Sequence, residues 1–135
     1  MKDRVIFVGL VSDDPVFYTS FEIMFKHYLK NAVVKTFKSL AELKSTVITA
    51  KFDLFLVDDI VSGAAILEPV SFIRQNRQET CTILYFGDDV HDMKTKSFRR
   101  GVNYFYSKPI DPRLVVYEIA TNFVALTQND YNSAP

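Results

Sequence analysis

Short runs of apolar residues, most of them ending in polar or acidic ones, alternate along the chain with stretches in which apolar residues recur at helical spacing. Five of these runs have the length and the β-branched or aromatic content of strands. They cover residues 5–11, 32–37, 52–58, 82–86 and 102–106. The helical spacing between and after them predicts five helices. This alternation favours a parallel sheet covered by helices on both faces, with right-handed crossovers.

Residues that cap or begin helices mark the start of each predicted helix. The clearest are Asp14 with Pro15 for the first helix, and the capping box formed by Ser39 and Glu42 for the second. The other signals are Pro69 for the third helix, Asp89 and Asp92 for the fourth, which Gly101 ends, and Asp111 with Pro112 for the last. The apolar side of the last helix is expected to hold Leu114, Val115, Ile119, Phe123 and Leu126.

The length of 135 residues is close to the commonest size of a single domain, so we expect one domain over residues 1–127 and a polar tail over residues 128–135. Sixteen basic and sixteen acidic residues leave no net charge, which gives no electrostatic reason to expect nucleic acid or a membrane as a partner. The longest apolar stretch, residues 5–11, is too short to span a bilayer, and we expect a cytoplasmic protein. The single cysteine, Cys81, is expected to be a small buried side chain.

Three charged residues follow strands of the predicted sheet: Asp13, Asp58 and Lys108. In an open parallel sheet the carboxyl ends of the strands share one edge, so these residues are expected to converge there. Two nearby carboxylates repel unless a cation joins them, and oxygen ligands suit Mg²⁺. Asp58 could then be a nucleophile that forms an aspartyl phosphate, with the Lys108 ammonium stabilising charge on the phosphoryl oxygens. The simpler alternatives are that Asp58 and Asp59 cap the following segment and that Lys108 is an ordinary exposed lysine.

Three segments carry a resemblance to a known family: residues 11–15, 53–58 and 101–111. In this order and spacing they resemble the receiver domain of two-component response regulators, and the resemblance extends from about Arg4 to Leu126. It implies a flavodoxin-like fold of five β-α units in three layers, with strand order 2-1-3-4-5. It also implies a signalling domain of a phosphorelay, which is not itself an enzyme.

The resemblance assigns roles to individual residues. It implies that Asp58 accepts a phosphoryl group from the histidine of a partner kinase and that Lys108 contacts this group. It implies that Asp13 and Asp58 hold Mg²⁺ and that Ile60 offers its backbone carbonyl to the metal. A sensor histidine kinase or a phosphotransfer protein is therefore expected as one partner. A downstream protein or a second copy of the chain is expected on the face made by the fourth helix, the fifth strand and the fifth helix.

Several positions depart from the family pattern. Ser12 stands where a second acid is usual, so the expected metal site has one charge fewer. Phe86 replaces the Thr or Ser whose hydroxyl binds the phosphoryl group, and its ring could fill the pocket. The aromatic switch position falls on Phe105, which has no hydroxyl. Two hypotheses follow: a phosphoryl-accepting receiver with an altered switch, or a degenerate receiver that acts by protein contact whatever its phosphorylation state.

Two other classes of protein share parts of this pattern. A flavodoxin-type flavin carrier has the same sheet order, but the segment after its first strand should cradle a phosphate, and Ser12-Asp13-Asp14-Pro15 is acidic. A Mg²⁺-dependent phosphatase with an aspartyl nucleophile needs a second carboxylate two residues after the nucleophile. That position is held by Ile60, so neither class is favoured.

Overall fold

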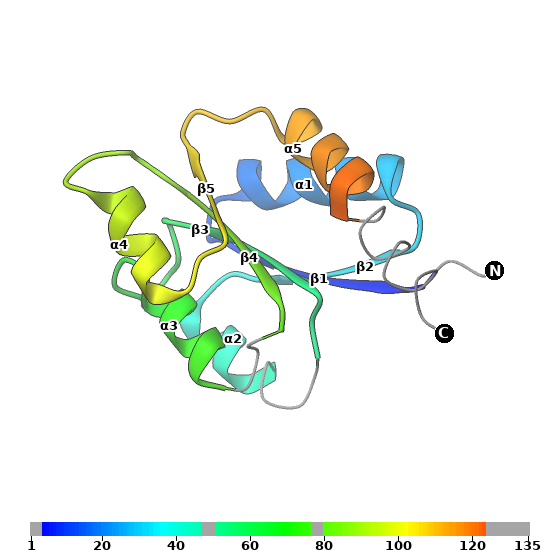
Figure 1. Cartoon of the computed structure of the whole chain (residues 1–135). Coiled ribbons are helices and arrows are strands. Elements are labelled where there is room, and N and C mark those ends of the chain that lie inside the picture. Colours follow the sequence, from blue (N-terminus) through cyan, green and yellow to red (C-terminus); the bar gives the residue numbers. More distant parts are fainter. Residues whose placement is uncertain (1–3, 47–50, 77–79, 124–135) are drawn as a thin grey trace, which may run out of the picture.

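Five parallel strands form one sheet in the order β2-β1-β3-β4-β5 in the computed structural model, which describes residues 4–46, 51–76 and 80–123 (Figure 1). The strands are β1 Ile6–Val11, β2 Ala32–Phe37, β3 Leu54–Asp58, β4 Thr82–Gly87 and β5 Tyr104–Ser107. The helices are α1 Pro15–Tyr28, α2 Leu40–Thr46, α3 Glu68–Gln75, α4 Met93–Arg100 and α5 Pro112–Glu118, and α5 continues as a π-helix over Ile119–Phe123. The predicted α/β class and strand order are confirmed.

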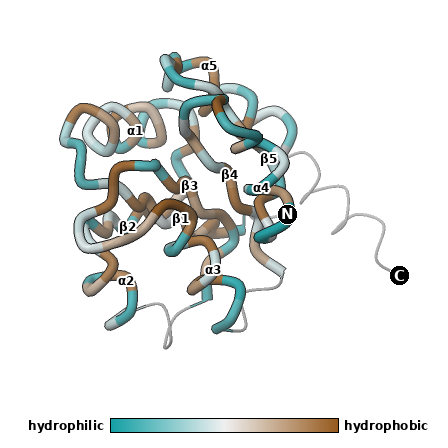
Figure 2. The backbone as a smooth tube through the Cα atoms, turned by 90° about the vertical axis from the view of Figure 1, so that its left-hand side faces the viewer, coloured by the Kyte–Doolittle hydropathy of each residue, from teal (hydrophilic) through white to brown (hydrophobic). Residues whose placement is uncertain are grey.

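Helices cover both faces of the sheet, and the sheet divides the core into two clusters (Figure 1). The helices α1 and α5 pack on one face, and α2, α3 and α4 on the other. All five residues of β3 are buried, because a central strand contacts helices on both sides. Figure 2 shows the apolar strands of the middle layer lying between α1 and α5 on one side and α2 and α3 on the other. The apolar runs of β1, β3 and β4 therefore correspond to strands buried on both faces, apart from the exposed Phe7 of β1. The edge strands β2 and β5 are only partly buried.

The predicted helix caps are largely present as hydrogen bonds. Asp14 accepts at 3.0 Å from the backbone N–H of Val16, and Asp111 accepts at 3.0 Å from that of Arg113. The Oγ of Ser39 accepts from the N–H of Glu42, whose carboxylate reaches back to residue 38. These bonds satisfy backbone donors that the first turn of a helix leaves without a partner.

Other expectations about the elements are wrong. Leu114 is 58% exposed, because the buried positions of the last helix are Val115, Val116 and Ile119. Asp92 holds the N-cap position of the helix after β4, as predicted, but its φ is 58° and its side chain makes no capping bond, and Asp89 is not at that position. The last strand begins at Tyr104, two residues later than expected. The side chains of Phe123 and Leu126 and the tail over 128–135 lie outside the described residues.

The side chain of Arg74 ties α3 to the beginnings of β4 and β5. Its Nη1 donates at 2.9 Å to the carbonyl of Cys81. Its Nε and Nη2 donate at 3.0 and 2.8 Å to the carbonyl of Gly101, which ends α4 with φ of 108°. Cys81 is buried, as expected. Within the described ranges, no helix combines the length and apolar character that crossing a membrane requires.

The packing of β1 beside β3 depends on Gly9. A Cβ built on Gly9 would lie 2.5 Å from Cε1 of Phe55, whose ring covers this position from the neighbouring strand. Two carbons that are not bonded to each other cannot lie this close, so any larger residue must displace a ring that is completely buried.

We therefore expect Gly9→Ala to lower the free energy of unfolding by about 1–3 kcal/mol, the usual cost of overpacking a core. Urea unfolding followed by circular dichroism measures this change. Shortening the opposing side chain should relieve the clash, so Gly9→Ala should cost less in a Phe55→Leu background than in the natural chain. Equal costs in the two backgrounds would contradict the proposed contact.

Candidate functional site

Asp58 and Lys108 meet at the carboxyl edge of the sheet. Asp58 is the last residue of β3, and Lys108 directly follows β5. The Nζ of Lys108 lies 2.5 Å from Oδ1 of Asp58, whose side chain is completely shielded from solvent. The backbone N–H of Lys108 donates at 3.0 Å to the carbonyl of Gly87 and so fixes the lysine beside the end of β4. Asp58 and Lys108 therefore lie in contact, as their positions at the ends of parallel strands predict.

Ser12 contributes a hydrogen bond to this site that its departure from the family pattern did not suggest. Its hydroxyl is buried and donates at 2.6 Å to Oδ2 of Asp58. The same Oγ accepts at 3.0 Å from the backbone N–H of Asp14, which orients the hydroxyl at the end of β1. The backbone N–H of Asp59 donates at 2.9 Å to Oδ1. Both oxygens of the Asp58 carboxylate are thus hydrogen-bonded within the fold.

Asp59 is a second partner of the lysine, although the sequence suggested only a cap at this position. Its Oδ1 lies 2.5 Å from Lys108 Nζ, so one ammonium group joins two adjacent carboxylates. Its backbone N–H donates at 3.0 Å to the carbonyl of Phe86. The sequence signal was the Asp58-Asp59 pair itself, but spacing alone cannot tell which of two adjacent acids faces the lysine.

Burial and ion pairing act in opposite directions on the two central groups. Burial raises the pKa of the Asp58 carboxyl, and the bonds from Lys108 and Ser12 reduce this rise without cancelling it. Burial alone would lower the pKa of Lys108, but the contacts with Asp58 and Asp59 outweigh it and raise the pKa above its ordinary value. The ammonium is therefore held in its charged form by the two carboxylates.

The backbone of Asp13 connects the segment after β1 with the segment after β3. Its N–H donates at 2.8 Å to the carbonyl of Ile60, while the Asp13 side chain lies exposed at the rim of the sheet. The Ile60 carbonyl keeps a second lone pair. Among the described residues, no group of three or more His, Cys, Asp and Glu side chains could hold a metal ion. A divalent cation here would depend on two carboxylates, Asp13 and Asp58, with the Ile60 carbonyl and water. Such an all-oxygen set suits Mg²⁺.

The ring of Phe86 lies in the core and forms part of an aromatic cluster. Phe86 is paired with Asp58 across β3 and β4 and is completely buried. Its ring stacks on Tyr106 with centroids 5.0 Å apart, and it packs against Phe17 and Phe21 of α1 at 5.3 and 5.4 Å. No hydroxyl is available at this position to bond a ligand. The other altered switch position, Phe105, is half-buried on the opposite face of the sheet, 6.2 Å from the ring of Tyr85.

Comparison with solved structures identifies the fold. A CheY-like receiver domain protein from Methanospirillum hungatei JF-1 superposes with a TM-score of 0.79 at 16% identity, over 94% of this chain and 99% of that one. The fold is that of response regulator receiver domains. The receiver domain of a sensor histidine kinase from Pseudomonas aeruginosa PAO1, which has a magnesium ion coordinated in its active site cleft, matches with a TM-score of 0.74 at 17% identity. The match covers 90% of this chain and 99% of that one.

The chemotaxis response regulator CheY4 of Vibrio cholerae has the same receiver fold. It matches with a TM-score of 0.75 at 18% identity, over 87% of this chain and 98% of that one. No family model matches the sequence, and no curated protein matches it either. The likeness is therefore one of receiver fold, at identities that leave each site residue to be judged on its own geometry.

We expect Ser12→Ala to raise the pKa of Asp58 further, because the variant loses a hydrogen bond that favours the charged carboxylate. It should also destabilise the fold at pH 7 by about 1–3 kcal/mol, since a buried acceptor loses its donor. Carbon NMR of the Asp58 carboxyl during a pH titration measures the first effect. Ser97→Ala is the matched control, because Ser97 is equally buried but bonds the backbone of Lys94. A shift in Ser97→Ala as large as in Ser12→Ala would contradict the assignment.

We expect Lys108→Met to destabilise the fold by about 3 kcal/mol at pH 7, because it leaves the buried Asp58 carboxylate without its cation. The pKa of Asp58 then rises further above its unfolded value. Its protonated form therefore stabilises the fold at low pH, and this contribution is lost as the pH rises through the folded pKa. The free energy of unfolding, measured at pH 5 and at pH 7, should therefore be lowered less by Lys108→Met at pH 5.

This difference in stability loss between pH 5 and pH 7 should disappear in the double variant Asp58→Asn with Lys108→Met, which has no charge at either position. Lys94→Met, on an exposed residue of α4, controls for loss of a lysine. A deficit in Lys108→Met that is the same at both pH values would show that the ammonium does not compensate the buried acid.

Proposed function

We propose that this chain is a phosphorelay receiver. In this proposal Asp58 accepts a phosphoryl group from a histidine of a kinase or phosphotransfer protein, and the domain signals by protein contact. The observation that supports it most strongly is the buried Asp58 carboxylate bound by Lys108 at the carboxyl edge of the sheet, where α/β folds bind ligands. The receiver fold agrees with this arrangement.

The proposed transfer moves one phosphoryl group between two side chains. An oxygen of Asp58 attacks the phosphorus, the bond between phosphorus and the donor's imidazole nitrogen breaks, and its electron pair returns to the ring. Lys108 is placed to stabilise charge on the phosphoryl oxygens. Asp13, Asp58 and the Ile60 carbonyl would hold Mg²⁺, which would neutralise charge on the incoming group. Because the Asp58 side chain is completely shielded, the surrounding segments must open before a donor can reach it.

A second candidate function is a protein-interaction module that works without phosphorylation. Phe86 favours it, because its buried ring offers no hydroxyl and belongs to an aromatic cluster that cannot rearrange cheaply. In this case the contact between Asp58 and Lys108 would be a structural ion pair. For either function, we propose the face of α4, β5 and α5 as a contact surface for a downstream protein or a second copy, since Phe98 and Tyr104 are exposed there.

Incubation with Mg²⁺ and acetyl phosphate, followed by mass spectrometry of the intact protein, distinguishes the two functions. We expect the natural chain to gain one phosphoryl group and Asp58→Asn to gain none. Asp59→Asn is the matched control, because it removes the adjacent carboxylate that contacts the same lysine. It should still be phosphorylated. No gain by the natural chain, or a gain that persists in Asp58→Asn, would reject phosphoryl transfer to Asp58 and favour the second candidate.

A further inference from the structure

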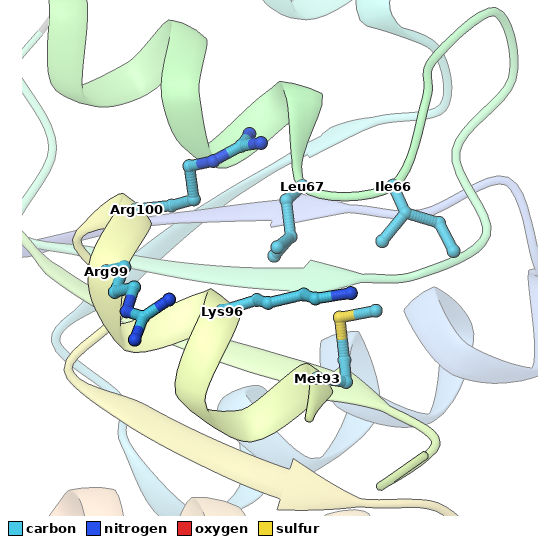
Figure 3. A pocket seen from close by; sticks show the side chains of 6 residues that line it. All are labelled: Ile66, Leu67, Met93, Lys96, Arg99 and Arg100. Atoms are coloured by element: carbon cyan, nitrogen blue, oxygen red, sulfur yellow. The ribbon is translucent and has the colours of Figure 1, made fainter. Parts of the chain in front are cut away.

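A groove of about 470 Å³ lies between the start of α3 and the outer side of α4 (Figure 3). It is lined by Ile66, Leu67, Met93, Lys96, Arg99 and Arg100. One wall of the groove is α4, which it shares with the contact surface proposed above, and the other wall is the segment before α3 and not β5. Its lining combines three cations with three apolar side chains and has no acid.

The cations of the groove come from one helix with a strongly uneven charge. Met93–Arg100 contains four basic residues and no acidic one, although the whole chain has no net charge. Three of the four line the groove. The Nη1 of Arg100 donates at 3.0 Å to Ser71 Oγ on α3, which holds this guanidinium at the inner wall. Lys96 extends across the groove between Leu67 and Met93 in Figure 3. The groove is thus a local concentration of positive charge.

The apolar part of the lining favours a ligand that has apolar groups as well as negative charge. Ile66 is 57% exposed, whereas Leu67 is 3% exposed and forms the base of the groove. Leu67 has φ of 68°, an unfavourable backbone conformation for a leucine that the surrounding structure must stabilise. Met93 adds a flexible side chain that adapts to different shapes. A phosphate backbone would satisfy the cations and leave these three side chains unused.

We propose that this groove binds an acidic protein segment that carries an aliphatic side chain between its carboxylates. The carboxylates would pair with Lys96 and Arg99 at the rim, and the aliphatic side chain would enter between Ile66, Leu67 and Met93. The volume suffices for a few side chains and not for a folded surface. Charge complementarity and the apolar base are both features of the unphosphorylated chain, so this interaction does not depend on phosphoryl transfer to Asp58.

The position of the groove places such a segment beside the carboxyl edge of the sheet. Ile66 and Leu67 end the segment that leaves β3 after Asp58. Met93 begins α4 after the segment that leaves β4. Both walls are therefore continuous with segments that start at the candidate site, and an occupant would lie against the ends of both.

The probe for this proposal is a blocked, dye-labelled peptide of twelve residues in which leucines recur among glutamates. Fluorescence anisotropy with the unphosphorylated chain measures its binding. We expect it to bind at least fivefold more tightly than the same peptide with serine in place of leucine, and more tightly than a labelled single-stranded oligonucleotide. Equal binding of the serine peptide or of the oligonucleotide would show attraction by charge alone, and absence of binding would likewise reject the proposal.

Three variants test the groove itself. Lys96→Glu and Arg99→Glu should each weaken peptide binding by roughly fivefold or more, because each replaces an attraction with a repulsion. Ile66→Ser should weaken binding of the leucine peptide and leave the serine peptide unaffected. Lys94→Glu is the matched control, since Lys94 is exposed on the same helix but does not line the groove. An equal loss in Lys94→Glu would place the interaction outside the groove and overturn the proposal.

Discussion

A buried carboxylate at the edge of a sheet is the feature on which this structure depends. Removing Asp58 from water is costly, and the fold compensates with the Lys108 ammonium, the Ser12 hydroxyl and the Asp59 backbone N–H. These donors come from the ends of three different strand segments. Inside the fold, the charged carboxylate is stabilised only where β1, β3 and the segment after β5 lie together, so the candidate site also links the segments that form it.

The aromatic cluster around Phe86 consists of packed rings, in contrast to the charged and hydrogen-bonded surroundings of Asp58. It packs the ring of Phe86 against α1 through Phe17 and Phe21 and so connects the sheet to this helix. A completely buried ring that packs on three others has a single place to lie. The ring of Phe86 is therefore held in the core between β5 and α1.

The course of the chain could be predicted from the sequence because its apolar runs are continuous and its helix starts carry strong capping residues. The convergence of Asp58 and Lys108 followed from the rule that parallel strands end at one edge. The bond from Ser12 could not be predicted, because it depends on the direction of one hydroxyl. Leu114 was misplaced because adjacent apolar residues on a helix differ by only 100°. The groove could not be predicted either, because it depends on the relative position of α3 and α4, which local sequence patterns do not determine.

The Arg74 side chain has a mechanical consequence for the two helices that flank the groove. By bonding the carbonyl of Gly101, it fastens the last turn of α3 to the residue that ends α4. A Cβ on Gly101 would come within 2.9 Å of this side chain, so the junction is closely packed. Arg74 therefore joins α3 and α4 at their C-terminal ends. Any change in the angle between α3 and α4 would therefore separate their first turns, near Ile66 and Met93, more than their last turns.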